Sequence, residues 1–362
     1  MTYPLKNQIP LSIFFVLIMS LFSTAVVSGQ EKEPPPRGPE PIFVTPPAAP
    51  TEVKLGLFLI GLDKVSPPSS AFPTFDAEMY IDMQWYDERL AFDPAEVGTD
   101  QKIFIEHEAE LELERIWWPD IGIENGEGVR LTENIELIIF ADGLIEYEER
   151  FVATVATDFD MRKFPFDEQD LEIDIESFAW DEESIIFTPM EEKTGSEVDH
   201  AGFEWLVQEV TTSVHSEEEI RSIHPFSEYI FIVHVERRPG YYLWRIMPMF
   251  ILIALSWSTF WMTGEPMSGR MGRSFIALLT VVGFHRIISD MMPRISYMTL
   301  LDGMVMIAYL FTSITIIENV IVNYYRTQED HAGALRVDQL ARWTVPLSFF
   351  ILSGIISLIF LG

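Results

Sequence analysis

Four long apolar segments follow Pro239 and constrain the fold of this chain more than any other feature. They run at about 242–262, 271–292, 299–324 and 342–361. Each is close to the ~20 residues that an α-helix needs to cross a bilayer. Tryptophan and tyrosine residues lie near their ends, as in the aromatic belts of membrane proteins. The sequence therefore predicts a transmembrane domain over residues 241–362.

The amino-terminal residues are typical of an exported protein. Lys6 precedes a short apolar core at 11–22, and small residues follow at 25–29, which together indicate a signal peptide over residues 1–28. Residues 29–50 are rich in proline, and a segment of this composition forms neither a helix nor an inner strand. We interpret it as an extended leader without an assigned function.

The charges near the four segments predict how they are oriented. Arg326, Arg336 and Arg342 lie between the third and fourth segments, and positive loops stay in the cytoplasm. With an exported amino terminus and four spans, both ends of the chain lie outside. We expect a multi-pass protein of the cell (inner) membrane with an extracellular or periplasmic ectodomain. The basic loop, about 326–341, is too short to fold as a kinase, cyclase or DNA-binding domain.

The ectodomain, residues 51–240, carries the net charge of −32 almost alone, with about 46 acids against about 13 bases. The membrane part has about 7 acids and about 8 bases. An acidic surface of this kind argues against binding nucleic acid. The chain has no cysteine, so an exported domain of this size depends on its own core without disulfides.

Short runs that alternate apolar and polar residues fill the ectodomain. Examples are AEMYIDMQWY, LEIDIESF and EYIFIVHVER, and the tripeptide ADG at 141–143 is typical of a hairpin turn. The pattern predicts a mostly antiparallel, immunoglobulin-like β-sandwich. The predicted fold class is an α+β membrane protein, in which this sandwich precedes a four-helix transmembrane bundle.

The segment EHEAELELE holds the densest group of acids. Taken as a strand, it places five carboxylates on one face: Glu106, Glu108, Glu110, Glu112 and Glu114. One interpretation is a solvated outer face, and another is an acidic ladder that concentrates cations in a water-filled vestibule. A hydrolase site with paired carboxylates is a third, although nothing in the sequence marks a substrate groove.

Other chemistry finds no support in the sequence. The seven histidines are scattered without ligand spacing, and no glycine-rich phosphate loop is present. We therefore expect no metal, no cofactor and no enzymatic activity.

The most specific string is FPFDEQ, which begins at Phe164. A proline-centred loop with two aromatic side chains suits an apolar surface better than water, and the tops of the membrane helices offer one. With YIDMQW, WWPD, RRPGYYLWRIMP and SFIALLTVV in the same order, the chain resembles the pentameric ligand-gated ion channels, or Cys-loop receptors. The cysteines of animal members fall on Thr157 and Leu171, so the chain looks like a bacterial member without that disulfide.

The resemblance implies a ligand box between adjacent subunits of a homopentamer. The residues at matching positions on one subunit are Asn125, Glu176, Phe178, Trp180 and the segment 213–226 with His224 and Phe226. Tyr80 and Phe58 match the facing subunit. An aromatic and acidic box suits an amine or aromatic agonist. The alternative interpretation of Phe178 and Phe226 is ordinary core packing. His215 and His224 are compatible with protons as the stimulus, because histidine changes its charge near neutral pH.

The resemblance also implies a coupling region and a pore. The coupling residues are Asp63, Lys64, Phe164, Pro165, Phe166, Asp167, Arg237, Pro293 and Arg294, with Asp167 paired to Arg237. The second span lines the pore. At 100° per residue, one arc of about 80° holds Gly272, Ile276, Leu279, Gly283, Arg286 and Asp290. Ile276 and Leu279 would form apolar rings that close a pore by dewetting, and His285 points away from this arc.

The ion filter departs from the family pattern. Cation-selective relatives usually place a glutamate at the inner entrance, where this chain has Ser268 and Gly269 and Glu265 is the nearest acid. The acidic ectodomain and Asp290 favour cations, while Arg286 opposes them. We predict a homopentameric, cation-selective channel. Two rival interpretations are a membrane-anchored binding or adaptor protein and a membrane-tethered hydrolase. The partners of the channel would be the agonist or protons, permeant inorganic ions and membrane lipid.

Overall fold

The structure is a computed structural model that describes residues 43–362 except 67–72, 219, 221, 291 and 293–294. The predicted signal peptide and most of the proline-rich leader lie outside the described residues. So do Pro293 and Arg294, which stay predictions for the coupling region.

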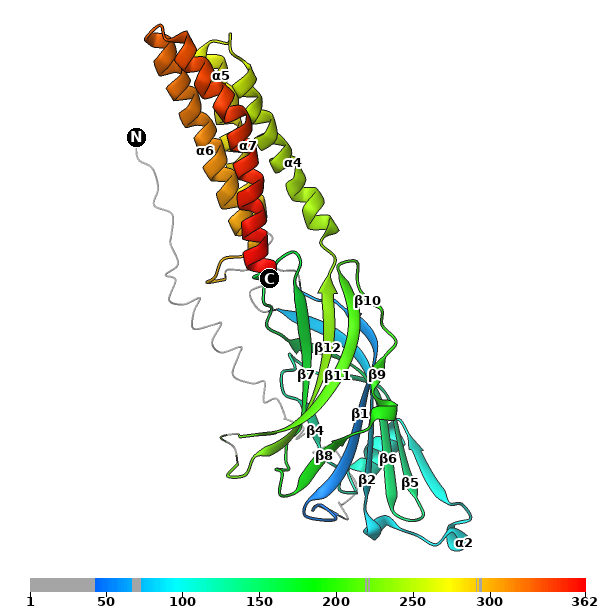
Figure 1. Cartoon of the computed structure of the whole chain (residues 1–362). Coiled ribbons are helices and arrows are strands. Elements are labelled where there is room, and N and C mark those ends of the chain that lie inside the picture. Colours follow the sequence, from blue (N-terminus) through cyan, green and yellow to red (C-terminus); the bar gives the residue numbers. More distant parts are fainter. Residues whose placement is uncertain (1–42, 67–72, 219, 221, 291, 293–294) are drawn as a thin grey trace, which may run out of the picture. The chain divides into compact units, whose positions relative to one another are not determined.

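The first sheet of the ectodomain has seven strands (Figure 1). Six of them are hydrogen-bonded in the order β3 (Gln101–Ile105), β5 (Leu131–Phe140), β6 (Leu144–Ala156), β2 (Thr74–Tyr86), β1 (Thr51–Asp63) and β8 (Ile185–Pro189), and β9 (Gly195–Ser196) also pairs with β1. All pairs are antiparallel except those of β1 with β8 and β9. The predicted ADG turn joins β5 to β6, where Gly143 has φ 91° and the Leu144 amide donates to the Asp142 side chain.

The second sheet has five strands in the order β10 (His200–Ala201), β11 (Trp205–Glu217), β12 (Phe226–Arg237), β7 (Glu168–Ser177) and β4 (Ile121–Ile123). The β11–β12 and β12–β7 pairs are long and antiparallel. Short helical turns connect strands of the first sheet: η1 (Glu88–Leu90) and α2 (Pro94–Val97) lie between β2 and β3, and η2 (Glu191–Lys193) lies between β8 and β9.

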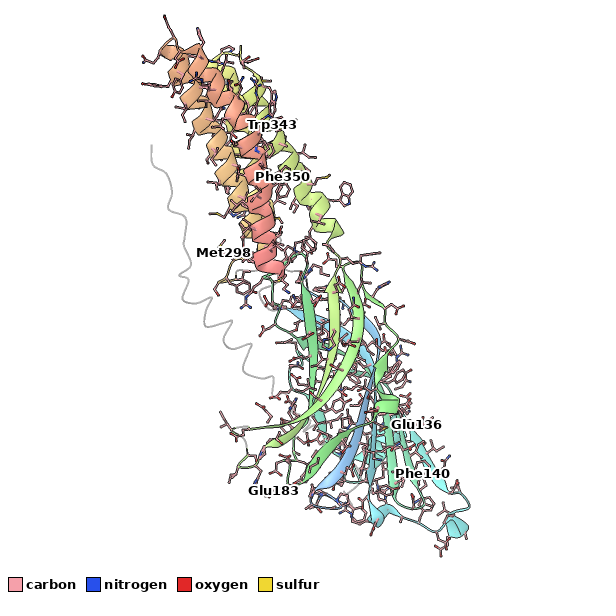
Figure 2. All side chains as sticks on the ribbon, viewed as in Figure 1. Glu136, Phe140, Glu183, Met298, Trp343 and Phe350 are labelled. Atoms are coloured by element: carbon pink, nitrogen blue, oxygen red, sulfur yellow. The ribbon has the colours of Figure 1, made fainter. Side chains whose placement is uncertain are left out.

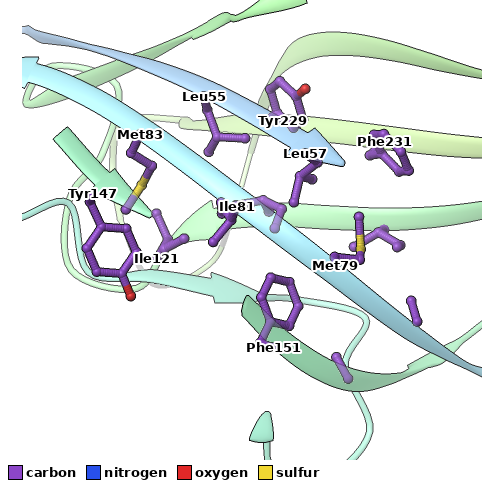
Figure 3. Close-up of a cluster of buried hydrophobic side chains, with 14 of the residues drawn as sticks. Leu55, Leu57, Met79, Ile81, Met83, Ile121, Tyr147, Phe151, Tyr229 and Phe231 are labelled. Atoms are coloured by element: carbon purple, nitrogen blue, oxygen red, sulfur yellow. The ribbon is translucent and has the colours of Figure 1, made fainter. Parts of the chain in front are cut away.

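The core lies between the two sheets, as the alternating sequence predicted. In β2 every second residue is buried, and the buried side chains of β1 and β2 meet those of β7 and β12. Figure 3 shows part of this cluster, including Leu57, Ile81 and Phe231. Each fully buried side chain of this size contributes roughly 1.5–3 kcal/mol relative to exposure. A core of this extent explains how the ectodomain folds without a disulfide.

The acidic segment 106–114 was predicted as a strand, and this was wrong. The structure has the helix α3 (His107–Leu113) there, directly after β3. Ala109 and Leu113 are buried four residues apart, which is the helical repeat. Alanine, leucine and glutamate are strong helix formers. The alternation of apolar and acidic residues in this segment fits a strand and a helix alike, and helix propensity decides between them. The acidic strand ladder at these residues does not exist.

Four helices long and apolar enough to cross a membrane follow β12. They are α4 (Gly240–Ser256) with the turn η3 (Trp257–Trp261), α5 (Met267–Ser289), α6 (Leu300–Thr327) and α7 (His331–Leu361). A capping box starts α6, in which the Thr299 hydroxyl accepts from the Asp302 amide and the Asp302 carboxylate accepts from the Thr299 amide. The β-sandwich and the four-helix transmembrane domain agree with the predicted fold class.

The connection between the third and fourth spans is much shorter than the predicted loop 326–341. Helix α6 ends at Thr327, and α7 begins at His331 with Asp330 as its capping residue. The first turns of α7 contain many polar residues, so hydropathy alone did not identify them as part of the helix. They include Asp338, which is 1% exposed, so this turn of α7 is packed within the bundle.

Candidate functional sites

The FPFD loop packs against the membrane helices. The ring of Phe164 lies 4.7 Å from that of Tyr242 on α4, in an edge-on contact, and Phe164 is fully buried. The Met161 amide donates to the Tyr297 hydroxyl at 3.1 Å, and the Leu300 amide donates to the Arg162 carbonyl at 2.9 Å. The loop therefore contacts both the first span and the start of the third, as its apolar character predicted.

Asp167 and Arg237 form the expected ion pair at the end of this loop. Arg237 Nε lies 2.8 Å from Asp167 Oδ1 and Nη2 lies 3.1 Å from Oδ2, with side chains 0% and 1% exposed. Gln169 donates a further hydrogen bond to Asp167 at 2.7 Å. The guanidinium also stacks on Trp205, 4.0 Å from the ring centroid. A bidentate, stacked pair of this kind fixes the last residue of β12 three residues before α4 begins.

The other predicted coupling residues are placed less centrally. Lys64 pairs with Asp76 of β2 at 2.7 Å and its side chain is 82% exposed. Asp63 ends β1 in an exposed position, Pro165 is buried in the loop, and Phe166 is 37% exposed. Their part in coupling stays a prediction.

Most of the predicted ligand residues of one subunit come together at one end of the second sheet. Glu176 lies near the end of β7, Phe178 and Trp180 follow it, and Phe226 opens β12. Across the strands, Glu176 faces Glu228, and Glu228 faces His215 of β11. Glu176 and Phe226 are 3% and 4% exposed, whereas Phe178 is 75% exposed.

Two members of the set have other surroundings. His224 pairs with Glu183 at 3.3 Å. Asn125 follows β4, and its side chain donates to the Glu172 carbonyl and accepts from the Asp174 amide of β7. There it borders a separate cavity of about 780 Å³ with an acidic lining, and the structure does not bring it next to Phe178 or Phe226.

The two residues expected from the facing subunit lie on the first sheet. Phe58 and Tyr80 are cross-strand partners on β1 and β2, so their side chains share one face. Tyr80 borders a cavity of about 230 Å³ together with Glu148 and Arg150. One subunit therefore presents the two halves of the predicted box on different sheets.

Two carboxyl groups near this end of the second sheet titrate far from their usual range. Burial, and then the charges of Asp174, Glu124, Glu217 and Glu172, raise the pKa of Glu228 to about 7. Burial and the charges of Glu172 and Glu124 raise the pKa of Asp174 to about 6. Sequence reasoning missed both residues, although the alternating acids of β7 in EQDLEIDIES were a visible signal.

Helix α5 is exposed along the predicted stripe and buried on the opposite side. Ile276 and Leu279 are 63% and 68% exposed, and no atom within 4 Å faces Gly272 or Gly283. The buried residues are Arg270, Ser274, Ala277, Val281 and Ile288. At 100° per residue they cover an arc of about 60° centred about 190° from Leu279. His285, expected to point away, contacts the Tyr309 hydroxyl of α6 at 3.1 Å.

The charged residues at the two ends of the stripe are paired. Arg286 Nη2 lies 2.9 Å from Asp290 Oδ1 near the last turn of α5. At the other end, Glu265 Oε2 lies 3.2 Å from Arg273 Nη2. The same oxygen would lie only 2.6 Å from a Cβ atom at Gly269, so the carboxylate occupies the space that this glycine leaves.

Comparison with known proteins identifies the family. The profile of the neurotransmitter-gated ion-channel ligand binding domain matches residues 41–239. The profile of the neurotransmitter-gated ion-channel transmembrane region matches residues 245–348. The chain belongs to the neurotransmitter-gated ion-channel family.

Relatives of this channel family come from bacteria and animals. The chain is 27% identical to the proton-gated ion channel of Gloeobacter violaceus over 332 residues, which covers 91% of this chain and 89% of that protein. It is 25% identical to a gamma-aminobutyric acid receptor subunit beta of Lymnaea stagnalis, over 76% of this chain and 56% of the subunit. The human subunit rho-2 is 25% identical over 71% of this chain and 55% of its own length. The chain thus spans little more than half of the animal subunits.

Membership of this ion-channel family settles several expectations. The chain is a multi-pass membrane protein and not an enzyme, which removes the hydrolase alternative. The described residues contain no cluster of three histidine or acidic side chains that could hold a metal ion, and the expected absence of a metal stays a prediction.

Apolar side chains of α7 such as Trp343 and Phe350 are 76% and 66% exposed, and Figure 2 labels both on this helix. Such exposed apolar residues are typical of a membrane span.

Proposed function

We propose that five copies of this chain assemble around α5 to form a channel, gated by an agonist or by protons at the ectodomain. The observation that carries this is the geometry of α5. Its stripe of small, aliphatic and finally charged residues is exposed and lies opposite the arc that packs on the bundle. A helix that only anchors a binding domain needs no such stripe. In a ring of five, the stripes line a pore, and Leu279 forms an apolar constriction that closes by dewetting.

The two halves of the predicted agonist box support assembly. Phe178 and Trp180 follow β7 of the second sheet, while Tyr80 and Phe58 lie on the first sheet. The box closes only where the second sheet of one subunit meets the first sheet of its neighbour. Aromatic rings beside Glu176 suit an amine or aromatic ligand. Asn125 follows β4 and borders the separate acidic cavity, so we assign it to that cavity and not to the box.

Protons are the second stimulus that the site supports. Glu228 titrates with a pKa of about 7 and lies between Glu176 and His215 in the same strand ladder. A relative that is 27% identical is a proton-gated ion channel. A group with this pKa changes charge near neutral pH at the candidate agonist site, so ligand and proton would act on one region.

Cation selectivity follows from the charges along the proposed pore. The Arg286 ring is compensated by Asp290 one turn away, so the outer mouth does not repel cations. At the inner mouth, the carboxylate of Glu265 lies over Gly269, about 80° from Leu279 around α5 and next to the stripe. Arg273, which pairs with Glu265, lies about 120° from Leu279 and so farther from the stripe than the carboxylate. Five such carboxylates therefore lie nearer the pore than their partners, in a ring of the kind that favours cations. The acidic ectodomain raises the local cation concentration.

We place the channel in the cell (inner) membrane with the ectodomain outside and the α6–α7 connection in the cytoplasm. Arg326, Arg336 and Arg342 near that connection support this orientation. The predicted signal peptide belongs to the same hypothesis, and labelling of the ectodomain in intact cells tests it.

Purification and reconstitution test the proposal. We expect particles with five-fold symmetry by electron microscopy, and currents from liposomes when amines or acidic solution are applied to the ectodomain side. Particles of another symmetry, together with no current under any ligand or pH, would leave the alternative of a membrane-anchored binding or adaptor protein.

A further inference from the structure

A cluster of charged side chains lies inside the helix bundle, on the side of α5 that faces away from the proposed pore. Arg270 of α5 is 1% exposed and contacts Glu318 of α6 and Asp338 of α7, which are 4% and 1% exposed. Its Nε donates to Asn319 Oδ1 at 2.6 Å, and Asn319 Nδ2 donates to Ser274 Oγ at 2.8 Å. One guanidinium thus joins three helices.

The cluster holds one positive group and two carboxyl groups. Both carboxyl groups contact the same nitrogen, Nη2 of Arg270. Within the part of the chain that the structure describes, the neighbouring cations are bound elsewhere. Arg273 pairs with Glu265, and Arg326 and Arg342 donate to backbone carbonyls of the α4–α5 region. Arg336 is exposed, and η3, the other element packed on this end, carries no charged residue.

Two ionised carboxylates beside one guanidinium would leave a net negative charge in the bundle. An uncompensated buried charge costs several kcal/mol even after relaxation, so a buried acid commonly takes up a proton instead. A like charge that shares its site has the same effect. The charge count therefore requires a proton on one of the two acids.

The contact geometry indicates which acid holds it. Asp338 faces the guanidinium with both oxygens, Oδ1 at 2.6 Å from Nη2 and Oδ2 at 3.2 Å from Nη1, the two-point arrangement of an ionised carboxylate. Both Glu318 oxygens instead approach the single nitrogen Nη2, at 3.3 and 3.2 Å. We propose that Glu318 is a proton-binding site of the membrane domain, neutral at neutral pH, beside an ionised Asp338–Arg270 pair.

This site lies in the membrane domain, apart from the ectodomain carboxyl groups. Alkaline solution would remove its proton and put a second negative charge against Arg270, which holds the inner half of α5 to α6 and α7. The proton site itself follows from charge and burial and does not depend on whether the chain conducts. Its effect on gating does rest on the proposed pore.

Infrared spectroscopy tests the proton directly on the full-length protein in detergent. The measurement is made in a Glu228→Gln background, because Glu228 is itself partly protonated at neutral pH. In that background we expect a C=O stretching band of a buried protonated carboxyl group at neutral pH, and the loss of this band when Glu318→Gln is added. The same band is expected to persist when Asp160→Asn, which alters an exposed acid, is added instead. A spectrum of the Glu228→Gln background without that band, or a band unchanged by Glu318→Gln, overturns the proposal.

Folding of two isosteric variants provides a second readout without any current. Glutamine resembles a protonated glutamic acid, so Glu318→Gln is expected to keep the yield and thermal midpoint of the wild type. Asp338→Asn removes the ionised partner of Arg270 and is expected to lower both. If Glu318→Gln fails to fold, or if Asp338→Asn is the harmless variant, the proton does not lie on Glu318. Liposome currents then separate the hypotheses: absence of any current contradicts the channel, not the proton site.

Discussion

Arg286 and Asp290 form an ion pair one helical turn apart, 2.9 Å between Nη2 and Oδ1, with side chains 78% and 58% exposed. Both residues belong to the exposed stripe of α5. The pair explains how an apolar span can end in an arginine and an acid, because each charge compensates the other at the exposed end of the helix, which is the proposed outer mouth of the pore.

Breaking this pair is expected to change ion selectivity in opposite directions. Asp290→Asn leaves a ring of unpaired arginines and should lower the ratio of cation to anion permeability. Arg286→Gln should raise it, and the double variant should lie near the wild type. Reversal potentials under a salt gradient measure the ratio, and equal values in all four proteins would remove these residues from the filter.

The inner mouth provides an independent test, because a glycine makes room for a carboxylate. Glu265→Gln is expected to lower the cation to anion permeability ratio. Gly269→Ala keeps the charge but displaces Glu265, since a Cβ there would lie 2.6 Å from Oε2. It should therefore also lower the cation to anion permeability ratio. Arg273→Gln, which frees Glu265, should act oppositely. A conducting Glu265→Gln channel with the wild-type ratio contradicts a carboxylate ring at this position.

Leu279 is expected to form the closed constriction. Leu279→Thr makes the constriction easier to wet, so resting current should rise and less stimulus should be needed. Leu278→Thr is the matched control, because the neighbouring residue points about 100° away and is only partly exposed. Equal effects of the two substitutions would show that the stripe is not the pore lining.

The Asp167–Arg237 pair is expected to matter for stability as well as coupling. Asp167→Asn removes the two-point carboxylate partner of a buried guanidinium and leaves only the half-exposed Glu204, 3.5 Å from Nη1. We expect a cost of about 3 kcal/mol, the lower end for a broken buried pair. Asp160→Asn is the control, because its pair with Arg162 is 58% and 66% exposed and is worth at most about 1 kcal/mol. Thermal unfolding followed by tryptophan fluorescence compares them. Similar midpoints would mean that water reaches the Arg237 pair.

Glu228 is expected to make the ectodomain more stable in acid. Its pKa rises from an ordinary 4.5 to about 7 on folding, so the folded state binds this proton more tightly than the unfolded chain. The stabilisation is complete below about pH 4.5 and is lost as pH rises towards about 7. Glu228→Gln should therefore flatten the decline of the thermal midpoint over this range. The exposed Glu236→Gln should leave it unchanged, and an equally steep decline in Glu228→Gln would refute the assignment.

The sequence predicted those parts of the molecule that a single strong physical signal determines. Hydropathy located the four spans, and helical periodicity placed Leu279 opposite residues that proved to be buried. The apolar loop at Phe164 was expected to meet the membrane helices, and it does. Each of these predictions needs only a local sequence pattern and the rule that apolar side chains avoid water.

Features that depend on long-range packing were not visible in the same way. Residues 106–114 fit two periodicities, and only the burial of Ala109 and Leu113 distinguishes them. The sequence pattern assigns both Asn125 and Phe178 to the predicted box. In the structure Asn125 follows β4 and Phe178 follows β7, and the two residues do not lie together. Arg270 looked like one more basic residue at a helix start, because its partners Glu318 and Asp338 are 48 and 68 positions away.

The absence of cysteine has a practical consequence for everything proposed above. Leu171, at one of the positions where animal relatives have a cysteine, is fully buried in the core, and the loop that follows Thr157 is fixed by Asp167 and Arg237 instead. Thiol reagents and reductants therefore have no target on the wild-type chain. Any single cysteine introduced along α5 becomes the sole thiol of its subunit, so chemical modification from either side of the membrane can map the proposed pore residue by residue.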